Sequence, residues 1–288
     1  MRHILVGLSA LLWAQAAQAL PDWPIPAVPA VLKSEIEGIQ LMREEKGPEA
    51  IAALEQAVKD GSNTALYRLA QIYYEGLGEQ WAERDKSIRY LQDAINNNQV
   101  EAMFVYALVG DNPSDEDAIR YMDRAATLGM AANVFKIGLK SMTEKQPFSM
   151  AVGVKLVESA ARAGFDPAMP VLGRLYIDGD EFQGIPADKE KAEIWLNRAV
   201  RAGYVGSISD LLKLRLDNPD VYPEEKYKWL YLCRALKCSY LTENPDIGQN
   251  ILPMLVKLEQ QMTPDMLAQT KVEINSLAKR IQRSNAQQ

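Results

Sequence analysis

The chain offers few residues for acid–base or metal chemistry. Its only histidine is His3, which stands inside a predicted signal peptide. Loss of that residue excludes a histidine general base, a Ser-His-Asp or Cys-His arrangement and a histidine-ligated zinc site. Two cysteines alone cannot form a structural zinc site. An enzyme built from this chain would therefore depend on paired carboxylates or a lysine base.

Acidic side chains gather at two places where loops are expected: Asp178, Asp180 and Glu181, and Asp115, Glu116 and Asp117. A calcium loop needs oxygen ligands at alternating positions over about twelve residues, and these stretches supply only fragments. The glycines at 76 and 78 lack the further glycine or the lysine-serine pair of a phosphate loop. We interpret the acids as solvated loop residues and helix caps. The prediction is a protein without catalytic, cofactor-binding or metal-binding residues, and without a cofactor.

The two cysteines, Cys233 and Cys238, pose a separate question. In an oxidising compartment a cysteine pair is usually bridged, yet five residues apart on a continuous helix the two lie on different faces. A disulfide therefore requires the helix to end near Leu236. The alternative is that Cys233 is a small core residue. A redox catalyst is not indicated, because the C-x-x-C spacing is absent.

The first nineteen residues have the features of a secretory signal peptide. Arg2 precedes the apolar run Ile4 to Trp13, and Ala17-Gln18-Ala19 forms a small-residue cleavage site. We expect cleavage after Ala19, with an apolar first helix of the domain as the alternative. No cysteine follows the apolar run, which argues against a lipoprotein, and no later run is long enough to span a membrane. The mature protein is predicted to be periplasmic or secreted.

Residues 20–30 contain four prolines. Proline at this density removes backbone donors and favours extended geometry. This N-terminal arm is either a tether or a segment that lies along the first repeat through Trp23 and Ile25.

A recurring pattern of residues organises most of the remaining chain. Its anchor is an alanine, with an aliphatic or other apolar residue three before it and a glycine or asparagine four after; every copy except that of Ala57 also has a large residue four before the anchor. The anchors, with spacings of 37, 31, 35 and 39 residues, are Ala57, Ala94, Ala125, Ala160 and Ala199. These positions share one helix face, and the terminal glycine, or Asn98 in one copy, suits the left-handed residue that ends many helices.

Each anchor helix follows another helix with its own signature, seen in Ala65–Gly76 and Ala168–Gly179. Together they read A-x-x-x-L-G-x-L-Y-x-x-G, a variable loop, then K-A-x-x-W-x-x-x-A-x-x-x-G. This pattern resembles the Sel1-like repeat, a relative of the tetratricopeptide repeat, over roughly residues 50–237. The copy at 168–203 matches nearly completely, whereas the copies near Ala102 and Asn133 are degenerate.

Periods of this length predict stacked helical hairpins, since one hairpin cannot bury both its apolar faces. We expect an all-α, right-handed α/α solenoid of about six hairpins over residues 31–239, followed by C-terminal capping helices over 240–288. Ser114 and Ser149 are predicted helix caps. The anchor of the last repeat is either Cys233 or Ala235.

First-helix residues outside the packing signature are candidates for a binding surface. The predicted partner-binding residues are Tyr67, Arg68, Gln71, Tyr74, Met103, Phe104 and Arg174. Tyrosine, methionine and arginine are enriched in protein interfaces. Ordinary packing between helices is the alternative role for each.

The 32 basic and 38 acidic residues give a net charge of −6, and no basic cluster suggests nucleic acid as a partner. The resemblance implies a non-catalytic scaffold that binds another protein in the bacterial envelope. Exported members of the family include immunity proteins that neutralise secreted effectors such as phospholipases, regulators of sensor kinases, and adaptors in polysaccharide export. Small size, acidity and the lack of a lipid anchor favour the immunity role. The competing hypotheses are a carboxylate-dependent glycan hydrolase and a structural protein that binds glycan.

Overall fold

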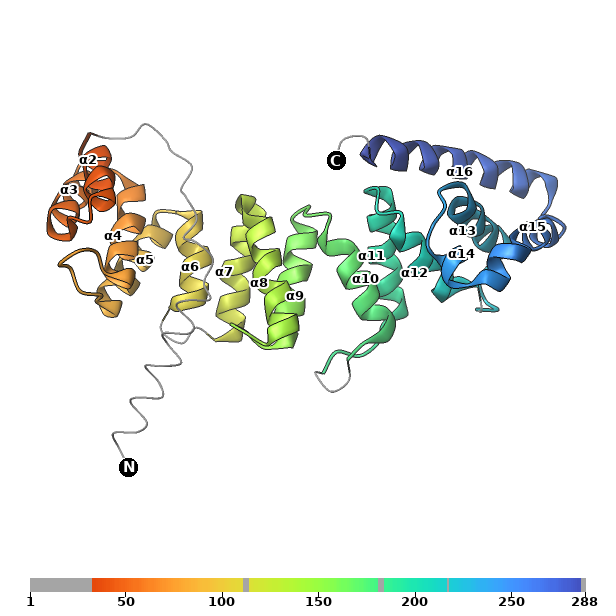
Figure 1. The fold of residues 1–288 in the computed structure, drawn as a ribbon, viewed down its shortest axis with the longest axis horizontal. Helices are drawn as coiled ribbons and strands as arrows, with labels where there is room; N and C mark the ends of the chain where they lie inside the picture. Colours follow the sequence, from red (N-terminus) through yellow and green to blue (C-terminus); the bar gives the residue numbers. More distant parts are fainter. Residues whose placement is uncertain (1–32, 111–113, 181–183, 217, 286–288) are drawn as a thin grey trace, which may run out of the picture. The chain divides into compact units, whose positions relative to one another are not determined.

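A computed structural model describes residues 33–110, 114–180, 184–216 and 218–285, and within them every regular element is helical (Figure 1). The predicted all-α class is therefore confirmed. The expected signal peptide and proline-rich arm lie outside the described residues. The chain divides into two compact units, residues 1–163 and residues 164–288.

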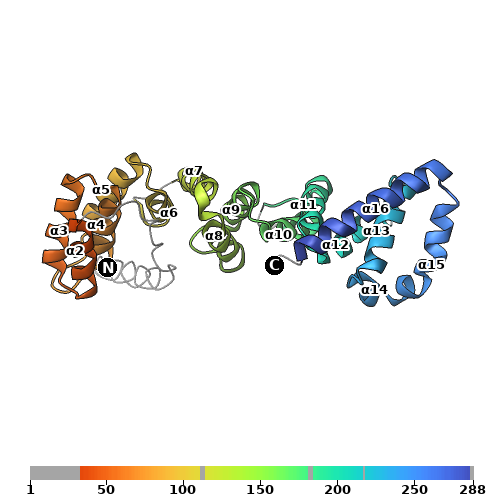
Figure 2. The same cartoon turned by 90° about the horizontal axis from the view of Figure 1, so that it is seen from above.

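The first unit is a stack of four helical hairpins, each formed by two consecutive helices that pack against one another (Figure 2). Its helices are α2 (Lys33–Arg43), α3 (Gly47–Lys59), α4 (Asn63–Glu75), α5 (Arg84–Asn96), α6 (Val100–Val109), α7 (Asp115–Ala125), α8 (Ala131–Glu144) and α9 (Met150–Arg162). The short η1 (Ala126–Met130) joins α7 to α8 and contains Gly129, whose φ of 114° turns the chain.

The second unit contains two more hairpins and a set of closing helices. These elements are α10 (Ala168–Asp178), α11 (Lys189–Arg201), α12 (Gly206–Arg215), α13 (Pro223–Ala235), α14 (Tyr240–Glu243), α15 (Pro245–Glu259) and α16 (Pro264–Asn285). Helix α16 packs against α11 and α13. The six hairpins agree with the predicted number, whereas the single turn α14 has no counterpart in the predicted elements.

The repeat register read from the sequence matches the packing. All five anchor alanines are 0% exposed. The residue four after each anchor has a positive φ, which glycine and asparagine adopt at little cost: Gly61 (95°), Asn98 (59°), Gly129 (114°), Gly164 (89°) and Gly203 (104°). The spacing thus reports both the buried face and the end of each second helix.

The last repeat is anchored by Cys233. Its side chain is fully buried, whereas Ala235 is exposed. Four residues later, Lys237 takes the left-handed conformation with φ of 52°, as the glycine does in the other copies. The register that the sequence left open is therefore that of Cys233, with Trp229 as the large residue one turn earlier.

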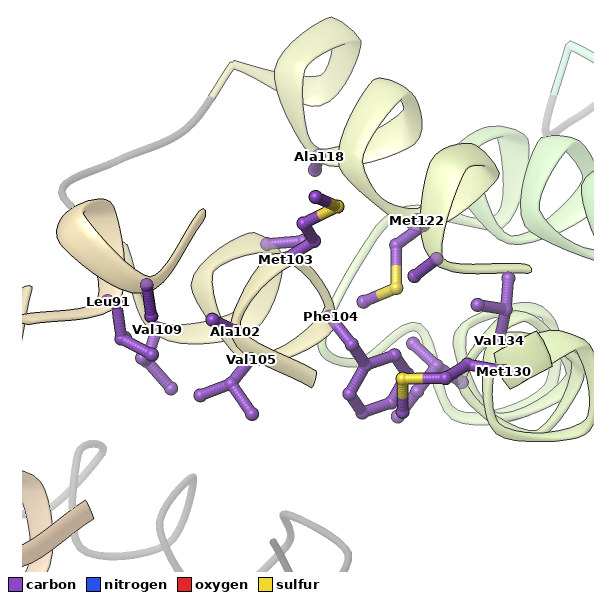
Figure 3. Packing of buried hydrophobic residues seen from close by; sticks show 14 of the residues in the cluster. Leu91, Ala102, Met103, Phe104, Val105, Val109, Ala118, Met122, Met130 and Val134 are labelled. Atoms are coloured by element: carbon purple, nitrogen blue, oxygen red, sulfur yellow. The ribbon is translucent and has the colours of Figure 1, made fainter. Parts of the chain in front are cut away.

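A hydrophobic core runs through the hairpins of the first unit. Met103 and Phe104 of α6 belong to one buried cluster with Met122 of α7 and Met130 of η1 (Figure 3). Methionine, which is unbranched and flexible, suits the irregular gaps left where the repeat is degenerate.

Side-chain caps begin several helices. The hydroxyl of Ser114 accepts a hydrogen bond from Asp117 N (3.1 Å), and that of Ser149 accepts from Val152 N (3.3 Å). Both predicted caps are confirmed. Ser62 and Asp188 cap α4 and α11 in the same way.

The loops inside two of the hairpins are closed alike. Leu77 bridges to Gln80 after α4, and Asp180 bridges to Ile185 after α10. The residue before the second helix of each hairpin then forms a hydrogen bond to a tyrosine carbonyl of the first helix. Glu83 N donates to Tyr73 O (2.7 Å) before α5, and Asp188 N donates to Tyr176 O (2.8 Å) before α11.

Candidate interaction surfaces

One candidate surface lies on α4 of the first unit. Arg68, Gln71 and Tyr74 are spaced by three residues each and so share one helix face. All three side chains are partly buried. Burial raises the pKa of the Tyr74 phenol, and the nearby charge of Arg84 opposes this rise. This face, defined by Arg68, Gln71 and Tyr74, is called the α4 face.

Two polar atoms of the α4 face are buried without a hydrogen bond. They are Nε of Arg68 and Oε1 of Gln71, which find no partner among the described residues. A buried donor or acceptor that is left unpaired costs about 1–3 kcal/mol. The first atom is a donor and the second an acceptor, and they lie one helical turn apart.

Three of the predicted partner-binding residues do not lie on a surface. Tyr67, Met103 and Phe104 are fully or almost fully buried and belong to the hydrophobic cluster of the first unit. The prediction that they form a contact surface is wrong, because their helix faces pack into the core. Burial also raises the pKa of the Tyr67 phenol.

The last predicted partner-binding residue, Arg174, lies on α10 in the second unit. Its side chain is 65% exposed, and its Nε donates to Oδ2 of Asp210 on α12 over 2.9 Å. Since Asp210 is buried, the guanidinium neutralises a carboxylate that would otherwise be isolated. Arg174 therefore already has an internal role.

Tyrosine rings line the hairpins of the first unit, but other groups cover them. Tyr73 and Tyr90 stack with centroids 5.6 Å apart, and Lys86 lies over the Tyr73 ring. Tyr106 meets Tyr121 edge to face at 5.3 Å. A glycan platform offers a free aromatic face; these contacts occupy part of the tyrosine rings, whereas the side chain of Trp81 is 85% exposed.

The acids expected to be solvated are mostly so. Asp178, Asp115 and Glu116 are exposed, and Asp117 and Asp180 are partly buried, while Glu181 lies outside the described residues. The two buried carboxylates of the described chain are Glu35 and Asp210. Glu35 accepts hydrogen bonds from Ser62 and Thr64, and Asp210 pairs with an arginine. Each lies in a different unit with its own partners, unlike the paired acids of a glycosidase.

A charged network connects α11, α12 and α13 in the second unit. Arg215 is buried and forms a two-pronged pair with Glu193, in which Nε and Nη2 donate to the two carboxylate oxygens over 3.1 and 3.0 Å. Its Nη1 donates to Glu225 over 2.7 Å. Such bidentate pairs fix geometry as well as charge.

Glu225 is the centre of this network. Besides Arg215, it accepts hydrogen bonds from Lys228 and, over 3.2 Å, from Nε1 of Trp229. Burial alone would raise the pKa of the Glu225 carboxyl, but these donors and the charges of Lys228 and Arg215 hold it below its ordinary value. Sequence reasoning missed the network. The available signal was Trp229, which occupies the position of Trp195 in the preceding copy.

Two hollows border the network where α13 and α16 meet. The larger has a volume of about 580 Å³ and is bordered by α11 as well. The smaller has a volume of about 260 Å³. Lys228 and Glu273, whose charged groups are 3.6 Å apart, line both hollows. In the described residues no group of three or more histidine, cysteine or acidic side chains could hold a metal ion.

The two cysteines are joined in the structure. Helix α13 ends at Ala235, and the chain turns back at Lys237, which brings the Cα atoms of Cys233 and Cys238 to 4.9 Å. That distance is within the usual range for a disulfide, and both side chains are buried. The sequence left open whether the cysteines form a disulfide or Cys233 is a small core residue. In the structure the disulfide is present, and Cys233 is also the buried anchor of the last repeat.

Among the described helices, none combines the length and the apolarity that a membrane crossing requires. Within the chain, the Sel1 repeat family matches residues 64–98, 100–130 and 168–204. No match was found among curated proteins.

Several solved structures are similar to the chain at low identity. One is a protective antigen present in uropathogenic Escherichia coli strains that displays an SLR fold, with 16% identity and a TM-score of 0.36 over 88% of this chain and 55% of that chain. The chain thus spans about half the length of that protein. A Sel1 repeat protein from Oxalobacter formigenes has 20% identity, a TM-score of 0.39, and coverage of 83% and 74%. An immunity protein from Pseudomonas aeruginosa has 16% identity, a TM-score of 0.31, and coverage of 84% and 86%.

The relation to the Sel1 family lies in the three matched segments. All three contain a second-helix anchor, Ala94, Ala125 or Ala199, and each of these alanines is buried. The chain therefore contains three Sel1 repeats.

Proposed function

We propose that the protein is a non-catalytic scaffold that binds another protein, and that the α4 face contacts an extended segment of that partner. The observation that carries the proposal is the pair of unsatisfied atoms, Nε of Arg68 and Oε1 of Gln71. Repeat solenoids provide extended surfaces for such contacts.

The chemistry of the pair fits a peptide backbone. Arg68 offers a donor that lacks an acceptor, and Gln71 offers an acceptor that lacks a donor. An extended peptide presents a carbonyl oxygen and an amide N–H within a few ångströms of each other along its edge. Because both atoms are buried, the two partly buried side chains must turn outward to reach the peptide, and binding would then satisfy both groups and remove the cost of leaving them unpaired. Tyr74, one turn further along, adds an aromatic ring of the kind enriched at binding hot spots.

We further propose that the partner is a toxic secreted effector and that this protein is its exported immunity protein. The resemblance to exported Sel1-like proteins, the acidic net charge of −6 and the predicted signal peptide support this role. An acidic inhibitor associates fastest with a basic target. The alternative roles are that of a regulator of a sensor kinase and that of an adaptor in polysaccharide export. Each alternative role requires a different partner protein.

Site-specific photocrosslinking in the native envelope tests the proposal. A photoreactive amino acid replaces Tyr74 on the α4 face, and the matched control carries it at Arg89, an exposed position of α5. We expect one protein to crosslink at position 74 and not at position 89, and mass spectrometry identifies it.

The crosslinked partner then decides the role. A secreted toxin whose activity the purified protein inhibits supports the immunity role, whereas a sensor ectodomain or an export subunit supports an alternative. Equal crosslinking at positions 74 and 89, or none at either, would contradict binding at the α4 face.

A further inference from the structure

The larger hollow of the second unit contains two arginines without counter-charges. Arg201 is the last residue of α11, and Arg280 lies on the facing side of α16. Both are exposed, and neither forms an ion pair or a side-chain hydrogen bond with the described residues. Other cations beside the hollow are already paired. Lys228 contacts Glu225 and Glu273, and Arg215 contacts Glu193 and Glu225.

The same hollow is also lined by apolar side chains. Val272 of α16 is 69% exposed. Leu277, about one and a half helical turns further along α16, is partly buried. Two free guanidinium groups around apolar surface make a surface suited to carboxylates that flank an aliphatic side chain.

We propose that this hollow binds an acidic segment of a partner protein. One carboxylate pairs with Arg201, a second pairs with Arg280, and an aliphatic or aromatic side chain between them covers Val272 and Leu277. Arginine suits this task because its planar fork matches a carboxylate in a bidentate pair. The inference does not depend on the α4 face, which lies in the other unit.

Two observations favour a protein segment over other anions. The chain has a net charge of −6, so long-range attraction adds little to the binding of a small free anion. Glu273 also borders the hollow, and its carboxylate disfavours a continuous polyanion such as nucleic acid or an anionic membrane. A segment with separated carboxylates leaves room for Glu273, and its contact with Val272 and Leu277 adds binding energy that does not depend on the net charge.

The test is selection of random dodecapeptides displayed on phage against the full-length, oxidised protein. We expect the enriched peptides to share aspartate or glutamate on both sides of an aliphatic or aromatic residue. A synthetic peptide of the most enriched sequence then serves as the probe in titrations. The double variant Arg201→Glu, Arg280→Glu is expected to weaken its binding by about tenfold or more, because two attractive pairs become repulsive.

A matched control changes the same charge elsewhere in the unit. Lys213→Glu with Arg234→Glu reverses two exposed cations outside the hollow, and we expect binding to change by less than about twofold. Arg201→Gln with Arg280→Gln removes the charges without repulsion and provides a milder test if the reversed variant does not fold. The pair Arg68→Ala, Gln71→Ala should leave this binding unchanged, which separates it from binding at the α4 face.

Three results would overturn the inference. The first is enrichment of peptides without acidic residues. The second is equal weakening by the control pair. The third is a bound anionic glycan, such as polygalacturonate, that displaces the peptide and needs both arginines, because it would assign the hollow to a different class of ligand.

Discussion

Nε of Arg174 on α10 donates to Oδ2 of Asp210 on α12 over 2.9 Å, and the two side chains differ greatly in exposure, at 65% and 7%. The contact joins consecutive hairpins of the second unit. An arginine that sequence reasoning placed on a binding surface thus compensates a buried charge.

Replacement of Arg174 by alanine should lower the free energy of unfolding by about 1–3 kcal/mol, because Asp210 is left buried without its counter-charge. Asp210→Asn in the same background should recover part of the loss. Urea denaturation followed by circular dichroism measures both. A double-mutant cycle with no coupling between the two positions would show that the pair is worth no more than an exposed ion pair.

Replacement of Glu35 by alanine should destabilise the first hairpins by about 1–3 kcal/mol. Its carboxylate accepts hydrogen bonds from Ser62 and Thr64 at the start of α4, where negative charge is also favourable. Glu37→Ala, an exposed change on the same helix, is the control and should alter stability by less than about 0.5 kcal/mol. Equal effects from the two changes would contradict the role given to Glu35.

Reduction of the disulfide between Cys233 and Cys238 should lower stability by about 2 kcal/mol, the value for closure of a short loop. Denaturation curves with and without reductant measure the difference. A variant with both cysteines replaced by serine is the control, since its curve should not respond to reductant. If the native protein is equally insensitive, the bridge either does not form or does not constrain the unfolded chain.

The free energy of unfolding should fall between about pH 10 and 12, and ionisation of the Tyr90 phenol should account for part of this fall. Burial raises the pKa of its phenol from 10.0 to about 12, and the carboxylate of Glu55 adds to the rise. The folded state therefore holds this proton more tightly than the unfolded state, so the stabilisation is complete below pH 10 and is lost as pH rises through the folded value.

The Tyr90→Phe variant should show a shallower loss over this alkaline range, whatever its stability at neutral pH. Unfolding midpoints measured at steps of pH give the slope. Tyr222→Phe, at an exposed site, is the control and should keep the slope of the unmodified protein. If Tyr90→Phe does not change the slope of the unfolding midpoint against pH, other groups cause the loss of stability at alkaline pH.

Replacement of Arg68 and Gln71 by alanine should leave the isolated protein as stable as before, within about 1 kcal/mol, because the changes remove two unsatisfied buried atoms. The same variant should lose the partner found by crosslinking at position 74. A large loss of stability would mean that these side chains serve packing, and pull-down of the partner at the unmodified level would remove them from the interface.

Prediction from sequence succeeded where a residue type has one structural meaning. A buried alanine such as Ala199 and a positive-φ residue such as Gly203 leave little choice of environment, so their spacing locates helix faces and helix ends. Together with the recurring first-helix signature, this was enough to predict the all-α class, the six hairpins and the serine caps.

The binding residues were harder to predict because a side chain such as Phe104 suits a core and an interface equally well. Whether it is buried depends on which neighbouring helix covers that face, and the degenerate repeats carry no signal for this. The network around Arg215 was missed for another reason. Its partners lie on α11 and α13, and no local spacing connects residues of different helices.

The two internal loops described after α4 and α10 share their closure but differ in length. A short backbone bridge seals each loop, and one hydrogen bond to a tyrosine carbonyl, at Tyr73 or Tyr176, sets the start of the second helix. The bridge and this hydrogen bond therefore fix where α5 and α11 begin. The loop after α4 also packs against the turn between α2 and α3, because a Cβ on Gly78 would lie 1.9 Å from the carbonyl oxygen of Glu45. An epitope or reporter grafted at Gly78 should therefore disturb the first two hairpins.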